Sequence, residues 1–435
     1  MSRSVWSAPY SGALTSGALL RQRFCNGFAE ALRTQWVLRP VKILVLNGID
    51  YGDGAGFWDR DAGLIVRDLR ALGVESWLLA FGETHQSTDP ARPLITAPRT
   101  VLEDPAWWKA QSPYGVLFFL WGATRFDPIR QAAQQATQRV IERLDTDGVR
   151  SPRVWFWSYM TARWAFQRDG GANAVVAPAL ALGRTLAVQA FPGLLDKKLA
   201  AGLSRLPLVV AESPIAIERI RRWIRSLSFA PPPMACITHP VDQECMVLDP
   251  AVERQNHIIC VGRWETKQKD LPLVLKALED FLALQPDWSA TLIGTEPRDL
   301  DQRLKRIRPE VRNRVRFAGK LPHRDLARFY QSAKIYFLAS RHEGFCIAAA
   351  EALCCGCAVV GPVDTAGMQF VAGYASGTVS CRRSRHHLVD ALCAEAAAWE
   401  AGWRDPRQIA GTWTQRVSAR VVAGQYLKAL RDLPG

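Results

Sequence analysis

The sequence lacks the features that would indicate a membrane-spanning or disulfide-stabilised protein. No apolar run reaches the length of a membrane span. Residues 1–24, MSRSVWSAPYSGALTSGALLRQRF, contain no compact apolar core of the length found in signal peptides. The 10 cysteines are scattered, and no second Cys or His pair stands at metal-ligand spacing. We therefore expect a cytoplasmic protein with reduced thiols and no bound metal.

Internal repeats, low-complexity stretches and a basic tail are also missing, although the formal net charge is +14. The densest basic stretch runs from Arg298 to Arg328. Aromatic platforms and known nucleic-acid-binding motifs do not accompany it, so we expect no nucleic-acid partner. A solvated helix face explains the stretch most simply. Attraction to an anionic membrane surface, which would make the protein peripheral at the inner face, or to a phosphorylated ligand is the alternative.

What the sequence contains is an alternation of short apolar strands and amphipathic helices, which predicts an α/β fold with parallel sheets. In the first half we expect strands at 41–47, 75–81, 116–121, 153–159 and 205–213, and Ser213-Pro214 is typical of a helix start. Residues 84–113 look rich in loops. Their Trp107 and Trp108, together with Trp121, could offer platforms on which a sugar stacks.

The pattern restarts at His257–Trp264 and continues through four further strands to residue 362. We therefore predict two doubly wound, Rossmann-like domains, at 40–240 and 241–410, that face a cleft. An extension, 1–39, precedes them. Thr412–Leu430 reads as one amphipathic helix, and we expect the segment 411–435 to pack back toward the N-terminal domain.

The most informative stretch is HEGFCIAAAE, His342–Glu351, which places two glutamates eight positions apart. A strand is predicted before it, so a helix N-terminus with free N–H groups lies beside Glu343, a usual place for phosphate. Glu351 lies inside the helix, roughly 12 Å further along its axis. This separation suits two hydroxyl-bearing ends of one extended ligand, as in a nucleotide sugar.

Two cations follow the strand that opens the second half. Arg263 and Lys269 lie in VGRWETKQKDL, after Gly262. Arg offers a planar fork and Lys a point charge, so the pair could clamp a diphosphate and stabilise charge on a leaving group. Gly294, in LIG, and Gly319, in RFAG, end two more predicted strands of the same half.

These motifs together resemble the retaining glycosyltransferases of family 4, which have the GT-B fold. The spacing of Glu343 and Glu351 is similar to the E-x7-E signature of that family. VVAESPIAIERI and THPVD, Thr238–Asp242, resemble its interdomain stretches. The likeness is strong over about 205–380 and thin in the N-terminal half.

The resemblance implies roles for individual residues. Glu351 would hold the ribose hydroxyls and Glu343 would face the transferred sugar. Arg263 and Lys269 would neutralise the diphosphate, with no metal ion and no cofactor. The remaining donor-binding residues would be Gly294, Leu321 near the base, and Gly344, Phe345, Cys346 and Ile347 at the helix start.

An N-terminal loop, GIDYGDGAG, would also face the cleft. Its Gly52, Gly54 and Gly56 allow close backbone approach to a phosphate or an acceptor, and Asp53 could orient an acceptor hydroxyl. A surface turn without such a role is the alternative.

Three positions depart from the family pattern. Many relatives carry an N-domain histidine near the reacting sugar, but no histidine lies between His85 and His239 here. Arg125 or Asp127 could fill that place, and His239 itself reads as a satisfied structural histidine. Asp270 stands where a glycine often follows the clamp lysine.

The sequence therefore predicts a retaining, metal-independent enzyme of EC class 2.4, a hexosyltransferase. It would move a sugar from a nucleoside diphosphate to the hydroxyl of a glycan or lipid-linked acceptor. Polysaccharide or glycolipid assembly is the expected setting, by analogy. The alternative is a catalytically inactive nucleotide-sugar-binding or scaffolding protein of the same fold. No clear motif supports an epimerase or a phosphorylase.

Overall fold

The chain divides into two units, Met1–Val41 and Lys42–Gly435. The computed structural model describes residues 41–434 except 51–57, 59–60, 121, 146–191, 267, 364, 366 and 369–375. The expected strand at 153–159 and the loop glycines Gly52, Gly54 and Gly56 with Asp53 therefore lie outside the described residues.

The first sheet has eight strands in the order β3-β4-β2-β1-β5-β6-β7-β8, and every neighbouring pair is parallel except β3 and β4. The strands are β1 (Lys42–Asp50), β2 (Glu75–Phe81), β3 (His85–Gln86), β4 (Leu94–Ala97), β5 (Gly115–Phe119), β6 (Val140–Leu144), β7 (Leu208–Ala211) and β8 (Met234–Cys236). Its central strands are buried on both faces, as expected for a parallel sheet covered by helices.

Helices connect these strands in the alternation that the sequence predicts. They are α2 (Asp61–Ala71), α3 (Arg99–Leu102), α4 (Pro105–Gln111), α5 (Asp127–Gln134), α8 (Pro192–Leu203) and α9 (Pro214–Ser226). The predicted helix start at Ser213-Pro214 is confirmed. The Ser213 side chain accepts a hydrogen bond from the Ala216 N–H, which satisfies one of the free donors at the N-terminus of α9.

The second sheet has six strands, all parallel, in the order β11-β10-β9-β12-β13-β14. They are β9 (Gln255–Arg263), β10 (Ser289–Thr295), β11 (Val315–Phe317), β12 (Ala333–Phe337), β13 (Ala358–Pro362) and β14 (Gly377–Ser380). Counted from β9 along the chain, this is the doubly wound order 3-2-1-4-5-6. The order reverses between β9 and β12, and ligands bind at the carboxyl ends of the strands at such a point.

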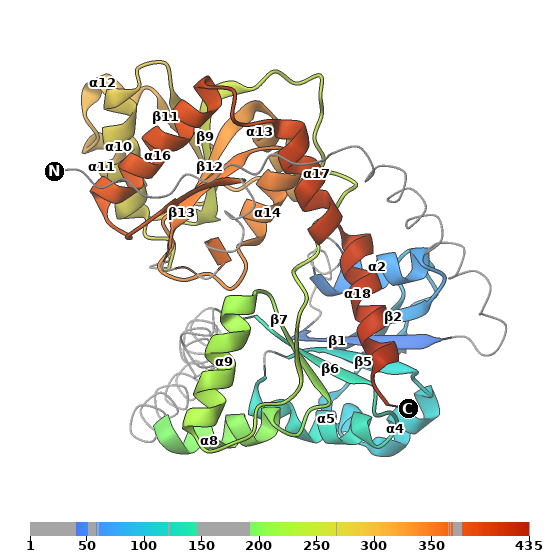
Figure 1. The fold of residues 1–435 in the computed structure, drawn as a ribbon. Coiled ribbons are helices and arrows are strands. Elements are labelled where there is room, and N and C mark those ends of the chain that lie inside the picture. Colours follow the sequence, from blue (N-terminus) through green and yellow to red (C-terminus); the bar gives the residue numbers. More distant parts are fainter. Residues whose placement is uncertain are drawn as a thin grey trace, which may run out of the picture. The chain divides into compact units, whose positions relative to one another are not determined.

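Helices cover both faces of this sheet (Figure 1), and a hydrophobic cluster lies on each face. One face packs against α13 (His323–Ser332), α14 (Ile347–Cys354) and α17 (Pro406–Val417). The other packs against α10 (Leu271–Leu284), α11 (Leu300–Lys305), α12 (Pro309–Arg312) and α16 (Arg385–Glu400). Val241 and Met246, from the segment after β8, are fully buried in the first cluster. That segment is therefore part of the core of the second sheet.

The expectation of a loop-rich segment at 84–113 is wrong, because β3, β4, α3 and α4 lie there. Trp108 is fully buried, and its indole N–H donates to the Leu102 carbonyl oxygen at 2.8 Å. It is a core residue and not a platform for a sugar, whereas Trp121 lies outside the described residues.

Strand β6 was not predicted because VIERL carries charges in a fully buried strand. Glu142 is completely buried and its carboxylate forms an ion pair with Arg130 at 2.9 Å. Arg143 is buried as well and donates to the Tyr426 hydroxyl at 2.6 Å. Paired charges can occupy a core, but they interrupt the apolar run by which a buried strand is found.

The expected single C-terminal helix is two helices, α17 and α18 (Ala419–Asp432), which meet at Ser418. Ser418 has extended backbone angles and forms an isolated parallel bridge with Val241. Helix α17 packs against α14 and helix α18 packs against α2. The amphipathic pattern continues through the break, so it does not mark the point where the chain turns.

Candidate functional site

An ion pair lies at the carboxyl ends of β9 and β12, where the strand order reverses. The Lys269 Nζ is 2.6 Å from the Glu343 Oε1, and both side chains are about nine-tenths buried. Burial lowers the pKa of the Lys269 amine, but Glu343 outweighs it, so this pKa lies above its ordinary value. The structure thus brings together two of the predicted catalytic residues at the edge where a ligand is expected.

Hydrogen bonds tie the loop after β9 to the loop after β12. The Gln268 side chain donates to the His342 carbonyl oxygen at 2.9 Å, and the Arg341 N–H donates to the Gln268 carbonyl oxygen at 2.8 Å. Arg263 is exposed at the end of β9, yet its charge still works to lower the pKa of Lys269. Of the two predicted clamp cations, Arg263 ends β9 and Lys269 lies in the loop that follows. Arg263 is exposed to solvent or to a ligand.

Asp270, just after this loop, takes the left-handed conformation that favours glycine, with φ 50°. Its carboxylate forms ion pairs with Arg341 at 2.9 Å and Arg383 at 2.6 Å. These contacts hold the aspartate in a conformation that is uncommon for a residue with a side chain. Asp270 thus adopts a backbone conformation that glycine would adopt readily.

The helix after β12 begins at Ile347, and the side chain of its cap residue, Cys346, makes no capping hydrogen bond. Cys346 occupies the cap position with φ 72°. Burial, and then the charge of Glu343, raises the pKa of its thiol to about 12, so the thiol stays protonated. Phe345 and Cys346 bury their side chains, so these positions can offer a ligand only their backbone. The helical rise applies only from Ile347 onward, which corrects the predicted spacing between the two glutamates.

Glu351 lies on α14 and is only 8% exposed. Its Oε1 is 2.9 Å from the His323 Nε2, and its Oε2 accepts a hydrogen bond from the Tyr330 hydroxyl at 3.2 Å. The hydrogen bonds of His323 with Cys245 and Glu351 raise its pKa to about 10 despite burial, so His323 is a cation beside this carboxylate. Glu351 is therefore held in one orientation, with its charge compensated.

Sequence reasoning missed His323, Tyr330 and Cys245. His323 stands 28 residues before Glu351, and no local pattern links them. The contact exists because α13 and α14 pack side by side on one face of the sheet. Only a prediction of which helices are neighbours could have found it.

Gly294 is enclosed by its neighbours at the end of β10. A Cβ there would lie 1.7 Å from the Gly262 carbonyl oxygen, and its φ is 137°. Its N–H donates to the Gly319 carbonyl oxygen at 2.8 Å. The three predicted glycines thus lie together at the ends of β9, β10 and β11, and Leu321 packs against the core nearby.

We expect Gly294→Ala to lower the free energy of unfolding by about 3 kcal/mol or more, because β9 must move and the backbone is strained. Chemical denaturation measures this change. The matched control is Gly411→Ala in α17, where a Cβ meets nothing within 4 Å. That control should stabilise by up to about 1 kcal/mol through helix propensity. Equal stability of the two variants would contradict the expected clash.

A second charged cluster lies at the carboxyl ends of the first sheet. The His239 Nδ1 is 2.5 Å from the Asp61 Oδ1, and its Nε2 is 2.5 Å from the Glu212 Oε1 and 3.9 Å from the Asp145 Oδ1. Arg143 is 3.5 Å from Glu212. His239 is therefore a satisfied histidine, as its sequence context suggested, although its partners are charged. Its ring also lies 5.9 Å from the ring of Phe345 in the loop after Glu343.

Burial shapes the titration of this cluster. Burial and then Asp145 raise the pKa of the Glu212 carboxyl to about 7, against the opposing charges of His239 and Arg143. Burial and the charge of Arg143 lower the pKa of His239, but the surrounding carboxylates raise it more. The pKa of His239 therefore lies well above its ordinary value. At Asp61 burial opposes ionisation, but His239 outweighs it and the pKa lies below its usual range. His239 also lowers the pKa of Asp145, whose side chain is 43% exposed.

These directions predict how stability depends on pH. Glu212 binds its proton more tightly in the folded state, so its contribution is present below about pH 4.5 and is lost as pH rises toward 7. The contribution of His239 to stability is likewise lost as the pH rises above 6.5, because its pKa is raised in the folded state. The lowered pKa values of Asp61 and Asp145 affect stability only below about pH 4.

Glu212→Gln removes the titrating carboxyl. We expect the stability of this variant relative to wild type to rise between pH 4.5 and 7, by about 3 kcal/mol for a shift of that size. Urea denaturation at several pH values measures the difference. Glu400→Gln, at an exposed position, should show no such trend. A difference for Glu212→Gln that stays constant over this range would contradict the raised pKa.

The residues weighed as substitutes for the missing histidine have other contacts. Asp127 forms an ion pair with Arg130 at 2.8 Å. The Arg125 guanidinium lies over the Phe126 ring, 4.3 Å from its centroid. Neither contact assigns a catalytic role.

Many arginines of the basic stretch serve the fold. Arg314 donates to the carbonyl oxygens of Leu282, Gln285, Pro286 and Trp288. Arg308 pairs with Glu279 and Asp280, and Arg303 with Asp299. These contacts favour a structural helix surface as the explanation of the stretch. Within the described residues, no helix is long and apolar enough to cross a membrane.

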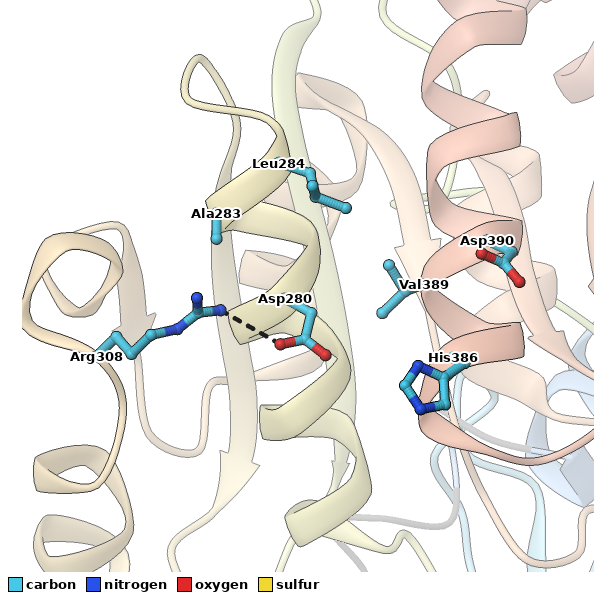
Figure 2. Close-up of a pocket in the computed structure, with 7 residues that line it drawn as sticks. All are labelled: Asp280, Ala283, Leu284, Arg308, His386, Val389 and Asp390. Atoms are coloured by element: carbon cyan, nitrogen blue, oxygen red, sulfur yellow. Dashed lines mark hydrogen bonds and ion pairs between the residues drawn. The ribbon is translucent and has the colours of Figure 1, made fainter.

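A surface hollow of about 330 Å³ lies between α10 and α16, as Figure 2 shows. Its lining residues are Asp280, Ala283, Leu284, Arg308, His386, Val389 and Asp390. None of the predicted donor-binding residues lines it. Two of the lining residues, Asp280 and Arg308, form an ion pair at 3.2 Å.

Part of the chain is similar to a known protein family. Residues 249–392 match the family model described as glycosyl transferases group 1. A curated human relative, one of the subunits of phosphatidylinositol N-acetylglucosaminyltransferase, is 27% identical over 127 residues, which are 29% of this chain. The match spans about a quarter (26%) of that relative.

Solved structures share the fold over nearly the whole chain. Sucrose-phosphate synthase from Thermosynechococcus elongatus has a TM-score of 0.59 and 17% identity, and the match covers 90% of this chain and 98% of that one. HepE from Anabaena in complex with UDP has a TM-score of 0.61 and 14% identity, covering 90% and 100%. The lipopolysaccharide outer core galactosyltransferase WaaB has a TM-score of 0.56 and 14% identity, covering 90% and 99%. These likenesses confirm the predicted GT-B fold.

Proposed function

We propose that this chain, whose residues 249–392 match the family model described as glycosyl transferases group 1, is a glycosyltransferase that takes its sugar from a nucleoside diphosphate donor. The donor would lie along the carboxyl ends of the second sheet. The two-sheet fold is that of glycosyltransferases, and a relative with this fold binds UDP and UDP-glucose.

The observation that carries the proposal is the arrangement around the glutamate pair. Glu343 and Lys269 form a buried pair at the point where the strand order reverses, beside a helix N-terminus whose cap residue makes no side-chain capping hydrogen bond. Glu351 is fixed a helix turn further on by His323 and Tyr330. A diphosphate is bound by cations and by the N–H groups of a helix N-terminus, and a ribose is bound by an oriented hydrogen-bond acceptor. One edge of the sheet offers all of these groups.

Within this proposal each group has a task. Lys269 and the exposed Arg263 would neutralise the diphosphate and stabilise it as it leaves. Glu343 would orient the Lys269 amine and face the transferred sugar. Glu351 would accept hydrogen bonds from the ribose. Transfer would need no metal ion or other cofactor, because the two cations supply the charge compensation that a metal would otherwise give.

The finer parts of the proposal extend the resemblance. They are retention of the anomeric configuration, a hexosyl donor, and a glycan or lipid-linked acceptor in polysaccharide or glycolipid assembly. They also include residence in the cytoplasm, with a peripheral contact at an anionic membrane. A catalytically inactive nucleotide-sugar-binding protein of this fold is the second candidate, because the N-domain histidine of many relatives has no counterpart between His85 and His239.

A two-stage experiment tests the proposal. A thermal-shift screen with UDP, GDP and ADP sugars should show one nucleotide that raises the melting temperature, because a ligand that binds only the folded state stabilises it. Purified protein with that donor should then release the nucleoside diphosphate when an acceptor is added. Stabilisation without any release would favour the inactive binder, and no stabilisation by any donor would contradict both candidates.

A further inference from the structure

Three metal-ligating atoms lie close together beside His323, the partner of Glu351. They belong to Cys245, His323 and Asp242. The Cys245 Sγ is 3.6 Å from the His323 Nδ1 and 3.8 Å from the Asp242 Oδ2. All three atoms lie within 4.8 Å of one another. Asp242 is buried, whereas Cys245 and His323 are partly buried. The cluster therefore borders the core and is open to solvent at His323, whose side chain is 22% exposed.

The two separations from the Cys245 sulfur match edges of a tetrahedral metal site. Zinc binds thiolate at about 2.3 Å and imidazole at about 2.0–2.1 Å, which places the two ligand atoms about 3.6 Å apart at a tetrahedral angle. A carboxylate oxygen at similar distance from the metal gives nearly the same separation from sulfur. The observed 3.6 Å and 3.8 Å therefore need little rearrangement to accept an ion.

The groups behind the ligands are those that a metal site requires. The His323 Nε2 is 2.9 Å from the Glu351 carboxylate, which directs its Nδ1 toward Cys245 when Nε2 carries the hydrogen. The other oxygen of Asp242 accepts hydrogen bonds from Arg67 and from the Glu244 N–H, both at 3.1 Å. Such outer partners fix ligand orientation in metal sites, and a carboxylate–histidine–metal series is a common form.

We propose that Asp242, Cys245 and His323 form a site for a borderline-soft divalent cation such as Zn²⁺, with a fourth position open to water. Thiolate, imidazole and carboxylate together suit zinc better than magnesium or calcium. The ion displaces the protons of Cys245 and His323 as it binds.

The position of the site gives the ion a structural task. Asp242 and Cys245 lie between Val241 and Met246, in the segment that leads from β8 to the second sheet, whereas His323 begins α13. A bound ion clamps this segment to α13 and holds His323 against Glu351. It takes no part in sugar transfer, and it would bind even if the chain transferred nothing.

The other cluster of this kind, Asp145, Glu212 and His239, differs in its charges. Arg143 lies 3.5 Å from Glu212, and His239 lies 2.5 Å from both Asp61 and Glu212. The 2.5 Å between the His239 Nε2 and the Glu212 Oε1 is also shorter than the roughly 3.4 Å between two ligand atoms of a tetrahedral zinc ion, so a metal ion has no comparable place there.

Cobalt is a suitable probe because a cobalt–thiolate bond gives a charge-transfer absorption in the near ultraviolet. Full-length, reduced and chelator-treated protein is titrated with Co²⁺, and Zn²⁺ is then added. We expect one equivalent of Co²⁺ with this absorption, displaced by Zn²⁺. Cys245→Ser should lose the absorption and weaken Zn²⁺ binding at least tenfold, whereas Cys381→Ser, which changes an exposed thiol just after β14, should match wild type.

Retention of the absorption by Cys245→Ser, or its absence from wild type at millimolar Co²⁺, would overturn the proposal. A second measurement on wild type avoids any folding defect of the variant. Zn²⁺ should protect Cys245, but not Cys381, from alkylation by a maleimide, as peptide mass spectrometry reports. Equal alkylation of Cys245 with and without Zn²⁺ would overturn the proposal as well.

Discussion

Glu343→Ala is expected to lower kcat by about 10²- to 10³-fold and to change the KM for the donor by only a few fold. The carboxylate fixes the amine of Lys269 at 2.6 Å, and that amine would stabilise charge on the leaving diphosphate. Removing one preorganised charge of this kind has an effect of about this size on turnover. Steady-state kinetics of nucleoside diphosphate release, with donor and acceptor varied separately, measures both constants.

A double-mutant cycle separates this role from a general loss of structure. Lys269→Met and Glu343→Ala should each lower kcat, and the double variant should lose far less than the product of the two effects, because the residues act as a pair. Each single variant also leaves a buried charge unpaired, so melting temperatures are compared throughout. Glu310→Ala, at an exposed position of α12, is the control. Independent effects of Lys269 and Glu343 would contradict the pairing in catalysis.

Glu351→Ala is expected to weaken binding of the nucleoside diphosphate by about 10- to 100-fold, because hydrogen bonds to a charged group contribute about 1.5–3 kcal/mol. At saturating donor, kcat should stay within a few fold of wild type. Glu351 lies on the helix and bonds to His323 and Tyr330, away from the Lys269–Glu343 pair. Isothermal titration calorimetry with the nucleotide that the thermal-shift screen identifies gives the dissociation constant.

The conservative variant Glu351→Gln sharpens this prediction. It keeps the size of the side chain and one acceptor oxygen, so it should fall between wild type and Glu351→Ala. Glu400→Ala, an exposed glutamate at the end of α16, should bind as wild type does. Unchanged nucleotide affinity in Glu351→Ala would remove Glu351 from the donor site, even if the chain proves to be a glycosyltransferase.

Much of the second sheet could be predicted because its strands are local apolar runs. HIICVG, KIYFLAS and CAVVGP are each bounded by glycine or by a polar turn, and each occurs as a strand. Glu343 and Lys269 could also be placed together, because strand ends of a parallel sheet meet at one edge. The first sheet was harder to read where buried charges replace apolar residues, as in β6.

What escaped prediction depends on contacts distant in sequence. The partners of Glu351 come from α13, and those of His239 come from α2 and from the residues that follow β6 and β7. The break at Ser418 depends on a bridge to Val241, far away in the chain. Helical periodicity and turn residues report local preferences only, so such pairings are set by tertiary packing.

The central claim is that an activated sugar lies along the carboxyl ends of the second sheet. A crystal structure of the complex with the nucleoside diphosphate tests it most directly. We predict ribose hydroxyls within hydrogen-bond distance of the Glu351 carboxylate, and a phosphate oxygen within that distance of the Lys269 Nζ and of the backbone at the start of α14. A nucleotide seated elsewhere, for example in the hollow beside Asp280 and His386, would contradict the account.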